Sequence, residues 1–286
     1  MGKFKIVFVD DILPITDVEK NIIEGFGCEL TQYSAFETKD ILEVAADADA
    51  IMTIGGKFNR ETIEGLKNCK VISRFGQGFD NVDVKAATEK GIVVTYVPVY
   101  CREEVATLAL TLMLACERRL LIADKTVKSG HWVDAAKSVN GARSVSAKTI
   151  GLIGLGSIQK QLVTYLKAFG CKLISYDPYI NLEFCKANGI EPVEKEYLLQ
   201  NADTVFVQVP LMESTWHMIA EKELAITHSP LKIYQIRTSG SKRMPVLSKT
   251  FCATSASTCF TSSAVALPKF TTKPACFVET AASPTW

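Results

Sequence analysis

Two glycines and one aspartate are spaced as in a site that holds a dinucleotide. Gly154 and Gly156 follow the apolar segment 149–153 and precede an amphipathic segment. The first glycine permits a tight turn, and the second lets a diphosphate approach N–H groups at a helix N-terminus, where the helix dipole favours negative charge. Asp177 ends the next apolar segment, where a carboxylate accepts hydrogen bonds from ribose hydroxyls. Because such a carboxylate repels the 2′-phosphate of NADP, the pattern predicts NAD.

One position departs from this dinucleotide fingerprint. Gln159 stands where a third glycine would allow the helix to pack closely on the strand. We expect its long side chain to push the helix outward and to weaken cofactor binding. The alternative for the whole motif is a structural turn that only connects a strand to a helix.

Apolar strand-like segments alternate with amphipathic helical ones in two series, one on each side of residue 100. In the first, strands are predicted at 5–9, 50–54, 70–73 and 92–97, and helices at 17–26 and 38–46. In the second, strands are predicted at 149–153, 172–176 and 204–209, and helices at 157–169, 182–188 and 195–201. This alternation predicts an α/β protein with two doubly wound parallel-sheet domains.

A single long helix over residues 102–128 is predicted between the two series. Glu103 and Glu104 lie in its first turn, where acidic side chains complement the helix dipole. Its middle, 105–116, is apolar nearly all round, so it must be buried somewhere. Packing between the two domains and packing between two subunits remain open as alternatives.

Composition excludes several classes of partner. The chain of 286 residues is 48% hydrophobic and has a formal net charge of +1. This balance predicts neither a nucleic-acid nor a membrane-surface partner. No segment reaches the roughly 18–20 apolar residues of a membrane span. The start of the chain lacks the features of a secretory leader. These observations favour a cytoplasmic protein.

The nine cysteines are scattered, with no CxxC pair, and only three histidines are present. We therefore expect reduced thiols and no metal site.

The amino-acid composition of the chain changes after Thr227. Residues 228–286 are rich in Ser and Thr and contain no Asp and one Glu, Glu279. They show no strand or helix period. We expect an irregular tail.

Residues 50–220 resemble the D-isomer-specific 2-hydroxyacid dehydrogenases, in the branch similar to D-3-phosphoglycerate dehydrogenase. The motifs that carry the resemblance occur in the same order along the chain: Arg74-Phe-Gly76-Gln77-Gly78-Phe-Asp80-Asn81-Val-Asp83, Val97-Pro98, Glu103-Glu104-Val105-Ala106, Gly130-His131-Trp132, Gly154-Leu-Gly156, Tyr176-Asp177-Pro178, Val209-Pro210 and Thr215. The resemblance implies a flavodoxin-like substrate-binding domain at 1–98, an incomplete Rossmann domain for NAD at 99–227, and the tail at 228–286. It also implies a homodimer as one possible assembly.

The activity implied by the resemblance is hydride transfer between NAD and the CH–OH group of a D-2-hydroxy acid, with the 2-oxo acid as the oxidised partner. The substrate carboxylate would contact Gly55 and the loop of Phe75, Gly76, Gln77 and Gly78. From the residues alone, that loop is equally well an anion-binding nest or a plain strand–helix turn. For the cofactor, Ser157 and Ile158 would lie over the diphosphate. Val209 and Pro210, with Thr215, would line the nicotinamide side.

The catalytic residues of the family find no match here. The resemblance implies an Arg, a His and an acidic residue after Val209-Pro210, to polarise the substrate and move a proton. Arg237 lies in the wrong setting, His228 is too early, and Glu279 is the single acid. His217 corresponds to a non-catalytic position, and we expect His131 only to pack. The catalytic residues are therefore unknown.

The alternative function is a catalytically inactive NAD(H)-binding regulator or a truncated paralogue. Our hypothesis is that residues 228–286 are not the family's C-terminal third and derive from a reading-frame slip or a mispredicted splice, which sequencing the transcript would test. Gln208 also replaces a usual His before Val209-Pro210.

Overall fold

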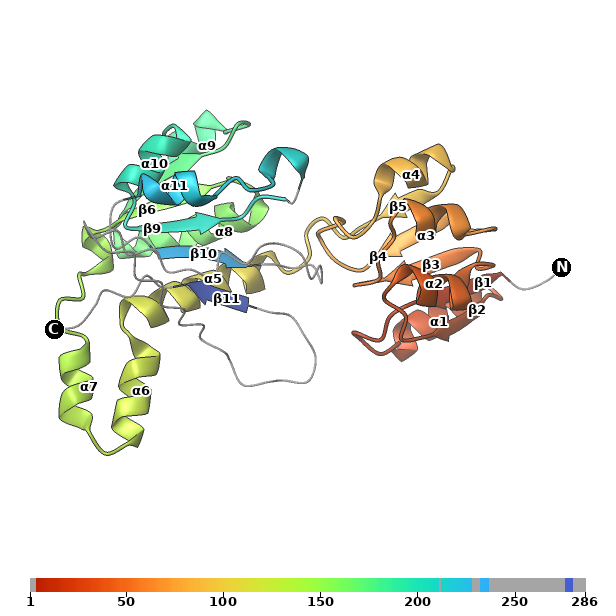
Figure 1. Cartoon of the computed structure of the whole chain (residues 1–286), viewed down its shortest axis with the longest axis horizontal. Coiled ribbons are helices and arrows are strands. Elements are labelled where there is room, and N and C mark those ends of the chain that lie inside the picture. The colour runs from red at the N-terminus through yellow and green to blue at the C-terminus, as the bar shows by residue number, and fades with distance from the viewer. Residues whose placement is uncertain (1–3, 211, 228–231, 237–275, 280–286) are drawn as a thin grey trace. The chain divides into compact units, whose positions relative to one another are not determined.

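The computed structural model describes residues 4–210, 212–227, 232–236 and 276–279 (Figure 1). The described residues form two compact units that divide between Tyr100 and Cys101. They are called unit 1 and unit 2 below, and each is described by itself. No helix among the described residues is long and apolar enough to cross a membrane.

Unit 1 is a five-stranded parallel sheet in the order β2-β1-β3-β4-β5. Its strands are β1 (Lys5–Phe8), β2 (Glu29–Gln32), β3 (Ala50–Thr53), β4 (Val71–Arg74) and β5 (Val93–Thr95), and its helices are α1 (Asp17–Gly25), α2 (Thr38–Ala45), α3 (Arg60–Gly65) and α4 (Val84–Glu89). This strand order is that of flavodoxin-like folds, and the predicted fold class is confirmed.

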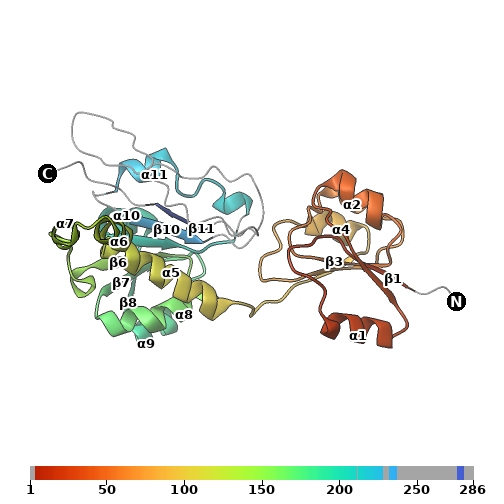
Figure 2. The ribbon, with the colours of Figure 1, turned by 90° about the horizontal axis from the view of Figure 1, so that it is seen from below.

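The main core of unit 1 lies between the sheet and three of its helices. Val7, Ile51 and Ile72 point from neighbouring strands into one cluster with Ile41 of α2 and Ile63 of α3. Helices α2, α3 and α4 contact one another in sequence, whereas α1 lies on the opposite face of the sheet (Figure 2).

Unit 2 has a six-stranded sheet in the order β11-β10-β9-β6-β7-β8. All pairs are parallel except β10 with β11, and β6 is central, as in Rossmann folds. The strands are β6 (Thr149–Ile153), β7 (Lys172–Tyr176), β8 (Ile190–Pro192), β9 (Thr204–Val207), β10 (Lys232–Ile236) and β11 (Cys276–Glu279). The α-helices are α5 (Arg102–Glu117), α6 (Leu120–Lys128), α7 (Trp132–Ser138), α8 (Ser157–Leu166), α9 (Leu182–Asn188), α10 (Lys195–Asn201) and α11 (Glu221–Ala225), with short 3-10 helices η1 (Val145–Ala147), η2 (Lys167–Phe169) and η3 (Glu213–Thr215).

Both faces of this sheet carry a buried core. On one face, Leu152 and Phe206 pack with Met113 of α5 and Leu162 of α8. On the other, Ile153 and Val207 belong to a second cluster, with Leu198 and Leu199 of α10 among its members. Figure 2 shows α5, α8 and α9 on one side and α10 and α11 on the other.

The long helix predicted over 102–128 is in fact two helices, α5 and α6. They are separated by Arg118 and Arg119, and Arg119 adopts a left-handed conformation with φ of 49°. No Gly or Pro marks this break in the sequence. Helix α5 is buried along one side only, and Figure 1 shows α6 and α7 projecting from the unit as a hairpin.

Two strands, β10 and β11, lie inside the segment expected to be irregular. Strand β10 extends the parallel sheet beside β9. Tyr234 is buried there against the ring of Phe206. The rest of the tail, including His228 and Arg237, lies outside the described residues.

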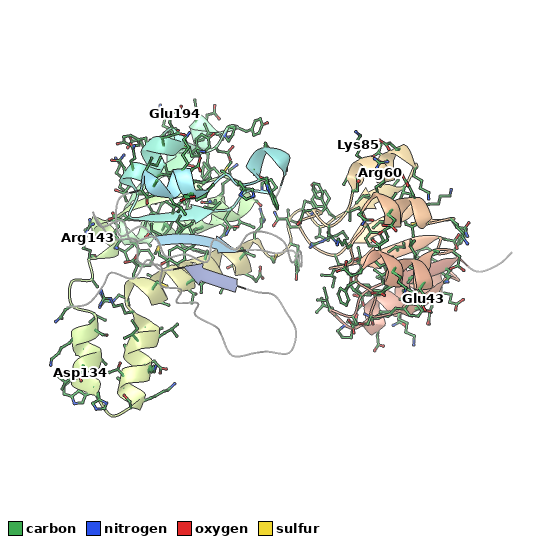
Figure 3. All side chains as sticks on the ribbon, in the orientation of Figure 1. Glu43, Arg60, Lys85, Asp134, Arg143 and Glu194 are labelled. Carbon is green, nitrogen blue, oxygen red and sulfur yellow. The ribbon has the colours of Figure 1, made fainter. Side chains whose placement is uncertain are left out.

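Two ion pairs fix the amino-terminal edge of the sheet in unit 2. Lys148 and Glu117 join the start of β6 to the end of α5 at 2.6 Å, and both side chains are nearly buried. Asp203 accepts the Thr149 N–H at 2.8 Å and binds Arg143, which is labelled in Figure 3, at 2.7 Å. These contacts anchor the starts of β6 and β9.

Candidate functional site

The turn between β6 and α8 lies where the strand order of unit 2 reverses. Strand β6 pairs with β7 on one side and with β9 on the other. Ligands of open α/β sheets bind outside the carboxyl ends of the strands at such a point. Gly156 is the N-cap of α8, so the unbonded N–H groups of the first helical turn open at this place.

The two glycines of the turn are required for different reasons. Gly154 has φ of +83°, and a Cβ there would lie 2.7 Å from Cγ1 of Val209 and 2.8 Å from the carbonyl oxygen of Gln208, so only glycine fits. At Gly156 a Cβ would meet no heavy atom within 4 Å. The backbone at Gly156 therefore faces open space, as approach by a diphosphate requires.

Asp177 follows β7 directly and has two backbone partners. Its Oδ2 accepts the N–H of Leu155 at 2.6 Å, and its Oδ1 accepts the N–H of Tyr179 at 2.8 Å. Each carboxylate oxygen can accept a second hydrogen bond, which leaves capacity for ribose hydroxyls. Asp177 thus also orders the glycine turn, a role that its sequence position does not reveal.

Gln159 is fully buried on the inner side of α8. Its Nε2 donates to the carbonyl oxygens of Ile153 at 2.9 Å and Phe206 at 3.0 Å. The helix stays packed on the sheet, since Leu162 and Leu166 have no exposed surface. The expectation that Gln159 pushes the helix outward is therefore wrong, because the amide replaces close glycine packing with two hydrogen bonds.

The segment after β9 packs beside the glycine turn. Val209 is the neighbour that would clash with a side chain at Gly154. Thr215 accepts the Met212 N–H at 2.9 Å and donates to the carbonyl oxygen of Pro210 at 2.6 Å, which closes the loop. Ser157 and Ile158 lie in the first turn of α8 and are half-buried. The predicted cofactor residues thus follow the carboxyl ends of three adjacent strands, β6, β7 and β9.

In unit 1, the predicted substrate contact at Gly55 has an internal partner. Asp10, fully buried after β1, accepts hydrogen bonds at Oδ2 from the N–H groups of Ile54, Gly55 and Gly56, at 2.7, 3.0 and 3.3 Å. The hydroxyl of Thr53 donates to the same oxygen at 2.9 Å. Asp10 is not among the residues predicted from the sequence, although an acid directly after an apolar strand is a usable signal.

The second predicted substrate loop begins where β4 ends. Phe75 donates its N–H to the carbonyl oxygen of Thr53 at 2.8 Å, and Gly76 donates to that of Arg74 at 3.1 Å. A Cβ at Gly76 would lie 1.6 Å from Nη1 of the buried Arg74, so glycine is required. Gln77 and Gly78 follow and are half-buried. A substrate carboxylate at this loop would have to share these N–H groups with their backbone partners.

The hydrogen-bond and ring contacts of the described histidines do not involve the glycine turn. His131 is the N-cap residue of α7 and lies 3.2 Å from the Ser129 hydroxyl. His217 is exposed after η3, with its ring edge-on to Trp216. No group of three or more His, Cys, Asp and Glu side chains suited to a metal occurs among the described residues.

The fold and the turn define a class: a two-unit α/β protein whose second unit is built to hold a dinucleotide. Residues 110–231 match the family described as D-isomer specific 2-hydroxyacid dehydrogenase, NAD binding domain. The chain is 38% identical over 215 residues to D-3-phosphoglycerate dehydrogenase of Methanocaldococcus jannaschii, covering 74% of this chain and 40% of that protein. It is 34% identical to glyoxylate reductase of Korarchaeum cryptofilum, covering 76% and 66%.

Solved structures agree with this assignment. A glyoxylate reductase from Paecilomyes thermophila superposes with a TM-score of 0.71 at 26% identity, covering 82% of this chain and 74% of the other. D-lactate dehydrogenase from Aquifex aeolicus, complexed with NAD and lactic acid, gives 0.69 at 25% identity, covering 80% and 68%. The chain belongs to the D-isomer-specific 2-hydroxyacid dehydrogenase family, and unit 2 carries its NAD-binding domain. The chain spans from 40% to 66% of the length of the two relatives named above.

Proposed function

We propose that this protein is an NAD-dependent oxidoreductase that acts on the CH–OH group of a D-2-hydroxy acid. The observation that carries the proposal is the β6–α8 turn, in which Gly156 faces open space and Asp177 orders the backbone from the next strand. Relatives of the chain include proteins named D-3-phosphoglycerate dehydrogenase, glyoxylate reductase and hydroxypyruvate reductase.

The residues around the turn suit each part of NAD. N–H groups at Gly156, Ser157 and Ile158 would bind the diphosphate at the N-terminus of α8. Asp177 would accept bonds from the adenosine ribose. The nicotinamide ring, which accepts or donates the hydride when NAD is bound, would lie on the side of Val209, Pro210 and Thr215.

The preference for NAD over NADP is tested at Asp177. The variant Asp177→Asn keeps an oxygen that can accept the Leu155 N–H but removes the charge that repels a 2′-phosphate. We expect the ratio of NADPH to NADH dissociation constants, measured by fluorescence titration, to fall about tenfold, or ~1.4 kcal/mol. Asp134→Asn, an exposed carboxylate on α7, is the control (Figure 3). An unchanged ratio in Asp177→Asn would contradict the assignment of Asp177.

Substrate recognition is proposed for unit 1. We assign the carboxylate of the 2-hydroxy or 2-oxo acid to Gly55 and to the loop of Phe75, Gly76, Gln77 and Gly78. The support is that both segments are glycine-containing turns that follow adjacent strands, β3 and β4, at the same edge of the sheet. Because the N–H group of Gly55 already donates to the Asp10 carboxylate and that of Phe75 to the Thr53 carbonyl oxygen, substrate binding requires local rearrangement.

A second candidate function is NAD(H) binding without turnover. It is favoured by the exposed positions of His131 and His217, because the described residues then offer no histidine paired with a carboxylate at the turn. The two functions differ in one experiment, in which NADH is titrated by fluorescence and oxidation of 3-phosphoglycerate and simple 2-hydroxy acids is then assayed. Binding with turnover supports the oxidoreductase, and binding without turnover supports the regulator. Absence of binding, with a broad unfolding transition, would indicate a truncated product.

We also propose a homodimer built through the α6–α7 hairpin. Leu120, Leu121 and Ile122 of α6 are 56, 47 and 55% exposed, and Trp132 of α7 is 69% exposed. Several large apolar side chains exposed on one short hairpin favour an interface. The substitution Leu121→Glu should shift the sedimentation coefficient from dimer to monomer, and a wild-type monomer at micromolar concentration would refute the proposal.

A further inference from the structure

We propose that Gln159 and Gln208 act as a pair of positioning residues that connects the two segments lining the cofactor site. One segment is the β6–α8 turn, and the other is the segment that follows β9. Both glutamines depart from the residues usual at these positions in the family. The inference rests on the NAD site proposed above.

Both residues bind the same backbone atom. The carbonyl oxygen of Ile153, at the end of β6, accepts the backbone N–H of Gln208 at 3.0 Å and the side-chain Nε2 of Gln159 at 2.9 Å. The Gln159 amide also donates to the carbonyl oxygen of Phe206 at 3.0 Å, so it bonds near the carboxyl ends of both β6 and β9.

Each glutamine also keeps one buried polar atom without a partner. Among the described residues, no hydrogen-bond partner is found for Oε1 of Gln159 or for Nε2 of Gln208. The first is an acceptor and the second is a donor, so their needs are complementary. Buried polar groups in native proteins are almost always satisfied, by protein or by an ordered water.

The alternation of side chains along β9 places the two amides on one side of the sheet. Phe206 packs in the cluster that contains Leu162 of α8, whereas Val207 packs in the cluster on the other face. Gln208 therefore faces the α8 side, as Phe206 does. No hydrogen bond joins the two amides in this structure, and we infer that Nε2 of Gln208 pairs with Oε1 of Gln159 through one water or after rotation of the Gln208 side chain.

This pairing connects the diphosphate side of the site to the nicotinamide side. The carbonyl oxygen of Gln208 and Cγ1 of Val209 form the wall against which Gly154 turns. A hydrogen bond from Gln208 to Gln159 would hold the segment of Gln208 and Val209 at a fixed distance from the first turn of α8. Two departures from the family would then compensate for each other.

A double-mutant cycle with NADH tests the pair. We would compare Gln159→Met, Gln208→Met and the double variant in the full chain, because methionine keeps the length of the side chain but removes its hydrogen bonds. We expect each single change to raise the NADH dissociation constant about fivefold to tenfold, and the double change to raise it no further. Gln161→Met is the matched control, since Gln161 is also on α8 and is half-buried but bonds only to Tyr165. Multiplication of the single effects in the double variant would overturn the pairing.

A second readout separates positioning from loss of the fold. We expect weakened binding of NADH and ADP-ribose but unchanged binding of adenosine, which lacks the diphosphate. An equal loss for adenosine would indicate a merely structural role. If a methionine variant fails to unfold cooperatively, Gln159→Gly combined with Gln208→His replaces it, and tighter NADH binding by Gln159→Gly alone would refute the proposal.

The free protein provides a test that does not depend on cofactor affinity. Hydrogen exchange of the Leu155 amide, measured by NMR, should accelerate in both single variants and remain unchanged in Gln161→Met. Wild-type protein that binds no NADH would refute the proposed function, whereas unchanged exchange at Leu155 would refute the pair.

Discussion

The sheets of unit 1 and unit 2 share one construction and differ in how their faces are covered. In unit 2, α5, α8 and α9 cover one face and α10 and α11 the other, and each face has a buried cluster. In unit 1, α2, α3 and α4 cover one face, while α1 is the single described helix on the other.

Apolar side chains remain exposed on the α1 side of unit 1. Helix α1 has no buried residue, and Val18, Ile22 and Phe26 at four-residue spacing are 65, 56 and 83% exposed. Phe4, directly before β1, and Val93 of β5 are 66 and 59% exposed. Parallel sheets are normally buried on both faces. Unit 2 therefore buries both faces of its sheet within itself, whereas the described part of unit 1 does not.

Truncation of an apolar side chain should change the free energy of unfolding far more on a helix of unit 2 than on α1 of unit 1. Leu162→Ala on α8 should lower the free energy of unfolding by about 3 kcal/mol, because it opens a cavity in a buried cluster. Ile22→Ala on α1 should lower it by less than about 0.5 kcal/mol. Native-state hydrogen exchange at β6 and β1 reports each unit separately. A cost at Ile22 close to that at Leu162 would show that another segment covers α1.

A smaller effect is expected at the turn glycines. Gly154→Ala should destabilise unit 2 by about 2 kcal/mol, since it combines a left-handed backbone with contact against Val209 and Gln208. Gly91→Ala in unit 1, with φ of +74° and open space around it, should cost about 1 kcal/mol. Thermal unfolding measures both.

Gly156→Ala is the matched variant for Gly154→Ala, because both glycines lie in the β6–α8 turn. Its φ of −76° suits alanine, so stability should stay unchanged while the added methyl group weakens NADH binding. Equal losses of stability in Gly154→Ala and Gly156→Ala would contradict the different jobs assigned to the two glycines.

The elements that sequence reasoning found are those with a strong apolar pattern. The buried strands β3, β6, β7 and β9 were predicted within one or two residues, because buried parallel strands are mostly apolar along their length. The edge strand β2 was missed, since its sequence Glu-Leu-Thr-Gln is half-exposed and carries no such pattern. The break between α5 and α6 was missed because Arg119 takes a conformation that its residue type does not favour.

The candidate site could be proposed from residue types and spacing, but its hydrogen bonds could not. Gly154, Gly156 and Asp177 are proposed from spacing alone, and the structure brings them together at the β6–α8 turn. The tertiary partners of Asp10 and Gln159 could not, because each bonds to backbone groups distant in sequence. A sequence motif specifies only side-chain types. The packing of Gln159 depends on hydrogen bonds to backbone carbonyl groups, which every residue has, so the sequence does not reveal it.

The smallest expected effect concerns pH and one carboxylate in each unit. In unit 1, the guanidinium of Arg60 hydrogen-bonds Glu89 at 2.7 Å and lowers the pKa of its carboxyl group. In unit 2, burial raises the pKa of Glu223, but hydrogen bonds from Lys195 and from the Ala220 N–H outweigh burial and lower it overall. A carboxyl group with a lowered pKa stabilises the folded state above its unfolded pKa, near 4.5, and this stabilisation disappears as the pH falls through the folded pKa.

Glu223→Gln should therefore cost about 0.5 kcal/mol at pH 7 and almost nothing at pH 3. Glu89→Gln should show the same pH dependence with a smaller amplitude, because its ion pair is exposed to solvent. Glu43→Gln on α2, labelled in Figure 3, is the control. Urea unfolding at pH 7 and pH 3 measures each difference. A cost at Glu223 that persists at pH 3 would mean that the side chain stabilises α11 by packing rather than by its charge.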